Sequence, residues 1–302
     1  MDDAHVQPWF AGTSGTLLLY KVNRRPFPQG NIFAKQPENV LDHFTEALLF
    51  GAPVTTGRKV SRMWRLGNRE IDLVAHKLSG HIGWIREDAE THDAYDAIKI
   101  QWRDRVFPKE VTARSVFVFD AVTRYLLVAQ HSSFSSQNVR QVFVTLLNKG
   151  EQNREYPTTE WDVEPILDNE SFRDWITKTA IVSKVKFVAK LPNPDGIENF
   201  PDVYARLEAM RAKKIEESVT ARDPAVGLRG IEEDLIAKQY LEMAQMAFGY
   251  ISAVGTNGST ETRYDQRDQG KRIFVQYPQT WNQLREMISN ELNSLRDKNG
   301  IQ

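Results

Sequence analysis

Residues 161–196 begin with Trp161-Asp-Val-Glu-Pro-Ile-Leu167 and a short segment from Ser171 to Lys178. They continue with Ile181-Val-Ser-Lys-Val-Lys-Phe-Val-Ala-Lys-Leu191 and close with Pro192-Asn-Pro-Asp-Gly196. This pattern predicts a strand, a short helix and a long strand rich in β-branched residues, which ends in a turn stiffened by two prolines. The stretch indicates an architecture, but it contains no catalytic constellation.

The sequence also predicts β-hairpins before and after this stretch. Ser115–Phe119 pairs with Tyr125–Ala129, and a second hairpin turns at Asn257-Gly258, a strong hairpin signal. Helices are expected at 37–50, from Ser135 or Ser136 to Gly150, and at 201–214, 231–248 and 281–295, with a turn at 78–81 and a charged loop at 216–229. Hairpins with intervening helices predict an α+β fold with antiparallel or mixed sheets and packed helices.

The sequence suggests no sharp domain boundary. A soft division near residue 157 would separate an N-terminal α+β region, 1–157, from a C-terminal α+β region, 158–302, and a single domain fits equally well. The helices at 231–248 and 281–295 have wide apolar faces. Such a face is either core or a self-complementary dimer interface. We therefore keep both roles open for these two helices.

Composition limits the function classes. The chain has 302 residues, no cysteine and a net charge of −1. The absence of cysteine excludes disulfides, cysteine-based zinc sites and thiol nucleophiles, and favours a reducing compartment. The acidic N-terminus lacks the pattern of a signal peptide, and the longest apolar runs have the length of strands, so we expect a cytoplasmic protein that does not span a membrane.

The strongest local charge cluster is the basic segment 58–69. It contains five basic residues and no acidic residue, namely Arg58, Lys59, Arg62, Arg65 and Arg69, with Trp64 among them. Guanidinium groups bind phosphate in bidentate fashion, and Trp64 could stack on a base or support the arginines. Contacts to phosphate alone give salt-sensitive binding without sequence preference. The alternative is a solvated strand whose charges pair with acids elsewhere.

A second basic set lies on the long strand of the opening stretch. Lys184, Lys186 and Lys190 are separated by even numbers of residues, so they share one face of that strand. Three lysines on one face could line a phosphate track. They could equally protect an exposed strand from aggregation, which is a common use of lysine.

An enzymatic alternative rests on Glu70 and Asp72, which resemble the acidic strand of restriction-type nucleases. Such enzymes need further groups to hold a divalent ion and activate water. Asp96 and Lys99 are the nearest substitutes, and they match the motif imperfectly. In the alternative reading, Glu70 and Asp72 are simply the solvent side of a half-buried strand. No standard metal-ligand or nucleotide-cofactor motif occurs, so neither a metal nor a cofactor is predicted.

Two strings in the opening stretch resemble a known family. Glu164-Pro-Ile-Leu167 followed by Val185-x-Phe-Val-Ala-Lys-Leu-Pro192 is similar to the corresponding stretch of the family of the lambda phage exclusion protein RexA. The resemblance extends loosely over residues 115–255. It implies a phage-exclusion or anti-phage defence role, with homodimers that bind double-stranded DNA without sequence preference. It assigns no catalytic or DNA-contacting residue, because the basic segment lies outside the similar region.

We therefore expect a homodimeric, sequence-nonspecific duplex-DNA-binding protein of a defence system. The residues expected to contact DNA are those of the basic segment, together with Lys184, Lys186 and Lys190. The alternatives are the metal-dependent nuclease, with Glu70, Asp72, Asp96 and Lys99, and a sensor or interaction subunit that acts on an effector or membrane partner.

Overall fold

The computed structural model describes residues 8–26, 37–57, 61–96, 101–155, 157–166, 169–191, 201–268 and 270–298, and only the backbone at 87–96, 101–111 and 169–170. These residues form six helices and twelve strands. The strands make two sheets in which all described pairs are antiparallel. The predicted α+β class, with antiparallel sheets built from hairpins, is confirmed.

The first sheet has the order β12-β1-β6-β5-β4-β3-β2, and β7 also pairs with β1. Its strands are β1 (Ser14–Pro26), β2 (Val54–Thr56), β3 (Arg62–Asp72), β4 (Lys77–Asp96), β5 (Gln101–Asp120), β6 (Tyr125–Ala129), β7 (Thr159–Pro165) and β12 (Arg272–Gln276). Helices α1 (Val40–Gly51) and α2 (Ser136–Gln152) pack on one face. Helix α6 (Trp281–Lys298) packs on the other through Leu284, Ile288 and Leu292.

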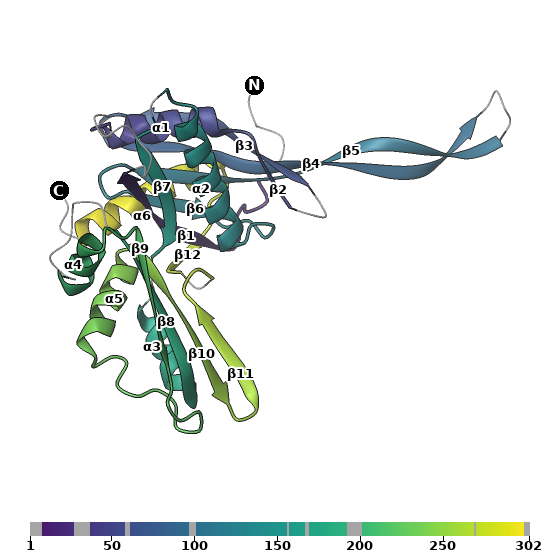
Figure 1. Cartoon of the computed structure of the whole chain (residues 1–302). Helices are drawn as coiled ribbons and strands as arrows, with labels where there is room; N and C mark the ends of the chain where they lie inside the picture. The colour runs from purple at the N-terminus through teal and green to yellow at the C-terminus, as the bar shows by residue number, and fades with distance from the viewer. Residues whose placement is uncertain are drawn as a thin grey trace.

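The second sheet has the order β11-β10-β8-β9 and lies below the first in Figure 1. Its strands are β8 (Ile181–Lys190), β9 (Lys214–Thr220), β10 (Gly249–Asn257) and β11 (Thr260–Asp265). Helices α3 (Asn169–Lys178), α4 (Pro201–Ala209) and α5 (Leu235–Gln245) contribute to its core. Because alternate residues of a strand face opposite sides, the other face of this sheet carries Lys184 and Lys186.

The most extended feature is the hairpin of β4 and β5. Each strand has 20 residues, and the register runs without a break from Lys77↔Asp120 to Asp96↔Gln101. The halves near the turns at 73–76 and 121–124 belong to the sheet, whereas the far halves project from the body as an arm (Figure 1). The arm therefore carries residues such as Asp96 far from the body.

A buried ionic cluster joins the two sheets. Asp162 of β7 pairs with Arg25 of β1 and with Lys190 of β8, in both cases at 2.5 Å. Glu164 accepts two hydrogen bonds from Arg140 of α2, at 2.7 and 2.9 Å, and also pairs with Lys190. Buried charges are tolerated only when they are paired in this way.

The division expected near residue 157 does not follow the sheets. β7, β12 and α6 all come after residue 157, yet they belong to the first sheet or pack on it. The chain leaves the first sheet after β7, builds the second sheet, and returns through β12. The boundary 1–157 and 158–302 is thus wrong as a structural division.

Some local expectations also need correction. The turn expected at 78–81 lies at 73–76, where the Asp72 carboxylate accepts hydrogen bonds from the backbone N–H groups of Val74 and Ala75, at 3.0 and 2.9 Å. Helix α2 continues past Gly150 to Gln152, and the expected helix at 231–248 is limited to α5. The charged loop expected at 216–229 begins within strand β9. The predicted turn at 192–196 lies outside the described residues.

The helices considered as dimer interfaces use their apolar faces within the chain. In α5, the buried residues Ala237, Tyr240, Met243 and Ala244 belong to the core of the second sheet. The buried stripe of α6 belongs to the first. These faces are core, which is the other role that the sequence allowed.

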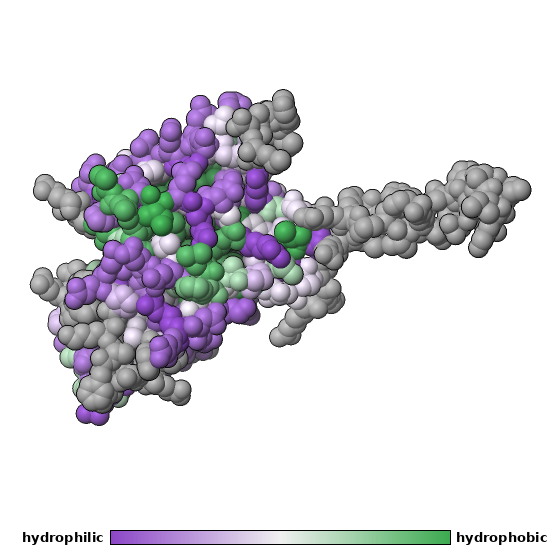
Figure 2. All heavy atoms as spheres, turned by 90° about the horizontal axis from the view of Figure 1, so that it is seen from above, coloured by the Kyte–Doolittle hydropathy of each residue, from purple (hydrophilic) through white to green (hydrophobic). Residues whose placement is uncertain are grey.

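Apolar side chains do reach the surface elsewhere. Figure 2 shows a mostly hydrophilic surface, on which hydrophobic side chains gather in a few places, one of them at the end of the molecule away from the arm. Leu73 and Val74, in the turn between β3 and β4, are 68% and 93% exposed. Among the described residues, no helix combines the length and the apolar character needed to cross a bilayer.

Candidate functional site

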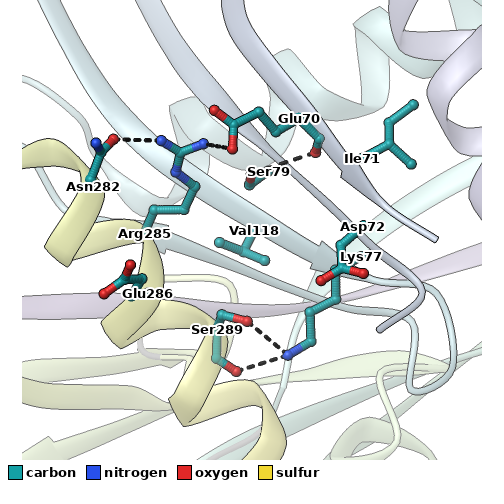
Figure 3. Close-up of a pocket in the computed structure, with 10 residues that line it drawn as sticks. All are labelled: Glu70, Ile71, Asp72, Lys77, Ser79, Val118, Asn282, Arg285, Glu286 and Ser289. Atoms are coloured by element: carbon teal, nitrogen blue, oxygen red, sulfur yellow. Dashed lines mark hydrogen bonds and ion pairs between the residues drawn. The ribbon is translucent and has the colours of Figure 1, made fainter. Parts of the chain in front are cut away.

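A polar cleft lies where β3 and β4 meet α6 (Figure 3). It has a volume of about 440 Å³. Both residues of the nuclease hypothesis that belong to β3, Glu70 and Asp72, line it from one side. The other lining residues are Ile71 of β3, Lys77 and Ser79 of β4, Val118 of β5, and Asn282, Arg285, Glu286 and Ser289 of α6.

The two cations of the cleft, Arg285 and Lys77, both have partners across it. Arg285 of α6 forms an ion pair with Glu70 and donates a hydrogen bond to Asn282 Oδ1 at 2.6 Å. Lys77 Nζ donates to Ser289 O and Ser289 Oγ, both at 2.9 Å, and to Asn293 Oδ1 at 2.6 Å. Burial lowers the pKa of Lys77, although the charge of Asp120 opposes the shift. All three ammonium protons of Lys77 are donated to acceptors on α6, so Lys77 links this helix to the sheet.

The cleft does not assemble a metal site. Asp72 is held by its own turn, and the described residues contain no group of three or more His, Asp or Glu side chains placed to hold a metal ion. Since a strand rises about 3.3 Å per residue, the 19 steps along β4 from Lys77 to Asp96 put Asp96 about 60 Å from the cleft. The grouping of Asp96 with Glu70 and Asp72 is therefore wrong, and Lys99 lies outside the described residues.

Two arginines, Arg65 and Arg114, lie side by side between the cleft and the base of the arm. Arg65 of β3 and Arg114 of β5 are both in register with Gly83 of β4, so the two arginines share the sheet face that α6 covers. The guanidinium of Arg114 lies 4.6 Å from the ring centroid of Trp281, at the start of α6.

The other two described arginines of the basic segment, Arg62 and Arg69, lie on the opposite face. The guanidinium of Arg62 lies 4.6 Å from the ring of Trp84, which belongs to the core under α1 and α2. Gly67 pairs with His81 and Glu70 with Ser79, so a bulge at Asn68 and Arg69 shifts the register. The Arg69 side chain passes over Gly80 next to Phe117, on the same face as Arg62.

Strand β3 is a sheet edge along much of its length. Only residues 62–64 pair with β2, and within the described part of the chain nothing pairs with the outer side of β3 after Trp64. No acidic side chain pairs with Arg62, Arg65 or Arg69 among the described residues. Arg65 and Arg69 therefore flank the open part of this edge, from the two faces of the sheet, and Arg62 lies next to it on the part that β2 covers. Arg58 and Lys59 lie outside the described residues.

Trp64 does not have the expected role. It is 1% exposed, donates a hydrogen bond from Nε1 to Thr56 Oγ1 at 2.8 Å, and packs against Phe134. A base could stack on its ring only if the core opened. The expectation that Trp64 contacts DNA is wrong, because strand alternation turns it inward while its neighbour Arg65 points outward.

The three lysines of β8 have different surroundings. Lys190 belongs to the buried ionic cluster, and Lys186 pairs with Glu216 at 2.7 Å. Lys184 is exposed and has no ion-pair partner among the described residues. A continuous phosphate track is therefore not formed, since one lysine is buried and another is neutralised.

Sequence reasoning missed Arg114 and Trp281. Arg114 is one arginine in a run of strand residues, and Trp281 follows more than 150 residues later. Only the pairing of β5 with β4, and the return of the chain as α6, bring them beside Arg65. No local pattern in the sequence could have indicated this group.

Comparison with known proteins places the chain in a family but does not assign an activity. No curated protein matches the sequence. A model of a domain of unknown function, DUF4747, matches residues 77–291, more than half of the chain. The match runs from the start of β4 into α6, and so includes the second sheet and the arm. The chain belongs to the DUF4747 family.

Proposed function

We propose that this protein binds double-stranded DNA without sequence preference, through phosphate contacts along the open edge of β3. The observation that carries the proposal is the position of Arg65 and Arg69 along the open edge and of Arg62 next to it, all three with no acidic partner among the described residues. Arg114 adds a fourth guanidinium on the face of Arg65. A duplex lying along the edge would meet cations from both faces of the sheet.

Arginine suits this role because its planar guanidinium makes paired hydrogen bonds to phosphate oxygens. Phosphate contacts position a protein on DNA but carry no sequence information. The overall charge of −1 fits a localised footprint on an otherwise balanced surface. Since Trp64 is buried, we assign no base-stacking residue to the interface.

The biological setting of the proposal comes from the resemblance to the RexA family. We place the protein in the cytoplasm, as a dimeric component of a phage-exclusion or defence system. The support is the similarity over residues 115–255, together with the lack of cysteine. The DNA-binding proposal stands on the arginines and does not depend on this setting.

The proposal is tested by fluorescence anisotropy with a labelled duplex, over a range of salt concentrations. We expect the wild type to bind duplexes of unrelated sequence equally, with an affinity that falls steeply as salt rises. The triple variant Arg62→Glu, Arg65→Glu, Arg69→Glu should lose most of this binding.

The matched control is Arg173→Glu on α3, where the native arginine is 69% exposed and pairs with Glu232. It should bind like the wild type. A wild type that fails to bind any duplex at low salt contradicts the function. Binding that the triple variant retains in full contradicts the site.

A further inference from the structure

The first sheet has a second open edge, at β12. In the described part of the chain, β12 pairs with β1 alone, through the register Ser14↔Gln276 to Leu18↔Arg272. An edge strand with unpaired backbone groups is a template for another strand. Natural proteins usually block such edges with a charge, a proline or a bulge, and the centre of β12 has none of these.

The centre of β12 is Phe274, whose side chain is 80% exposed. Its neighbours Ile273 and Val275 point to the other face and pack against the core under α6. Arg272 and Gln276 share the exposed face with Phe274. A large aromatic side chain at the middle of an open edge would gain free energy from burial against a partner strand, because its exposure to water is unfavourable.

The hydrogen bonds of β1 show which backbone groups of β12 face outward. Thr16 is opposite Phe274, and its carbonyl accepts a hydrogen bond from Gln130 N at 2.8 Å, on the side of β6. Three positions along the register, the pair Thr13 and Tyr277 is of the other type, and Tyr277 N donates to Thr13 O across the two strands at 2.8 Å. Because the two types of pair alternate, the N–H and C=O of Arg272, Phe274 and Gln276 point away from β1.

We propose that β12 pairs with β12 of a second copy of this chain, in antiparallel register about a two-fold axis at Phe274. In this register Phe274 faces Phe274 of the second copy, and Arg272 faces Gln276 in both directions. In each of these pairs the backbone N–H and C=O groups of both residues point away from β1, so each pair would form two backbone hydrogen bonds between the two copies. The two first sheets would then form one continuous sheet.

The sequence of β12 complements itself in this register. Arg272 meets an amide and never a second arginine, so no like charges oppose each other. Ile273 meets Val275 on the α6 face, which extends the apolar cores of both copies across the axis. A two-fold interface requires this self-complementarity. The fit to its own sequence favours a second copy over an unrelated strand, and it does not depend on the DNA-binding proposal.

The cysteine-free chain permits a direct test by cross-linking. Residues opposite each other in a hydrogen-bonded antiparallel pair have Cα atoms about 5.5 Å apart, within the range of a disulfide. Phe274→Cys should therefore form a covalent dimer under mild oxidation. The control is Val219→Cys on β9, an edge strand of the second sheet where the native valine is 40% exposed. It should remain largely uncross-linked.

Analytical ultracentrifugation gives an independent readout. The wild type should sediment as a dimer, twice the 34.7 kDa of one chain. Phe274→Lys and Phe274→Glu should each weaken dimerisation about ten-fold or more, because like charges meet at the axis. An equimolar mixture of the two variants should recover the dimer, because opposite charges then meet.

Recovery in the mixture excludes misfolding as the cause of the weakening. A monomeric wild type at tens of micromolar overturns the proposal and leaves the edge for a strand of another protein. A dimer in which Phe274→Cys fails to cross-link, or in which Val219→Cys cross-links equally well, overturns the assigned interface. DNA binding by a monomeric wild type would leave the proposed function intact.

Discussion

Arg65 on β3 and Arg114 on β5 lie in one row across the first sheet, and both are in register with Gly83 on the strand between them. Neighbouring strands are about 4.8 Å apart, so the two Cα atoms are separated by roughly 10 Å. Their long side chains rise from the same face, with Trp281 of α6 next to Arg114. The topology thus creates a cationic surface at the base of the arm that the sequence alone does not contain.

Arg65→Gln should weaken duplex binding equally for all DNA sequences. If Arg65 contacts one phosphate, its loss should also reduce the slope of log affinity against log salt by about 1. The measurement is a salt titration by fluorescence anisotropy with two unrelated duplexes. Arg263→Gln serves as the control, since the native side chain is 76% exposed and already pairs with Glu261. An unchanged slope would mean that Arg65 makes no phosphate contact.

Gly83→Ala should destabilise the protein, whereas Gly67→Ala should be close to neutral. A Cβ at Gly83 would lie 2.6 Å from the carbonyl oxygen of Ala113, while a Cβ at Gly67 would meet nothing within 4 Å. Overpacking of this kind typically costs about 1–3 kcal/mol. Urea denaturation of both variants measures the difference. If the two variants were equally stable, β4 and β5 would be able to shift at Gly83 without a loss of stability.

Local signals in the sequence are sufficient to predict where many helices and hairpins begin or turn. The sequence indicates Ser135 or Ser136 as the start of a helix, and Ser135 is the N-cap of α2, since its side chain accepts a hydrogen bond from Asn138 N at 3.1 Å. The Asn257-Gly258 pair was expected to turn a hairpin, and Gly258 has a φ of 63° between β10 and β11. In both cases the deciding interaction lies within a few residues, so it leaves a readable pattern.

The errors come from contacts that are distant in sequence. Ser79 and Gly80 are typical of a turn, yet they lie inside β4, where Lys77 is held by α6 more than 200 residues later. The acidic stretch at Glu216 forms β9, where Glu216 lies diagonal to Lys186 of the neighbouring strand β8 and pairs with it at 2.7 Å. Trp64 was assigned to DNA from its basic neighbours, and only the position of the α1/α2 core shows that it is buried.

Lys190→Met should be much more damaging than Lys186→Met. Lys190 is buried between Asp162 and Glu164, and its loss leaves two buried carboxylates with fewer cations. Removing one partner from a buried ion pair costs roughly 3–5 kcal/mol. Lys186 pairs with Glu216 at the surface, where solvent screens the ion pair and it contributes little to the free energy of unfolding. Urea denaturation at pH 7 compares the two, and equal losses would contradict the structural role of the cluster.

Acid should unfold this protein through two buried carboxylates. Burial alone would raise the pKa of Asp162, but the charges of Lys190 and Arg25 lower it to about 2. Burial likewise opposes ionisation of Glu151, but hydrogen bonds from His43, Thr158 and Trp161 lower its pKa to about 2. In the unfolded chain both groups titrate near their ordinary values of 3.8 and 4.5.

Because both pKa values are lowered on folding, the stabilisation is fully present above about pH 4.5 and is lost as the pH falls toward 2. One pKa unit corresponds to about 1.4 kcal/mol, so each carboxylate should contribute about 2–3 kcal/mol to this decline. Glu151→Gln should be less stable than the wild type at pH 7 and should lose less stability between pH 4.5 and pH 2. Urea denaturation at several pH values tests this. A wild type with the same free energy of unfolding at pH 2.5 and pH 7 would show that neither carboxylate depends on its ionised state.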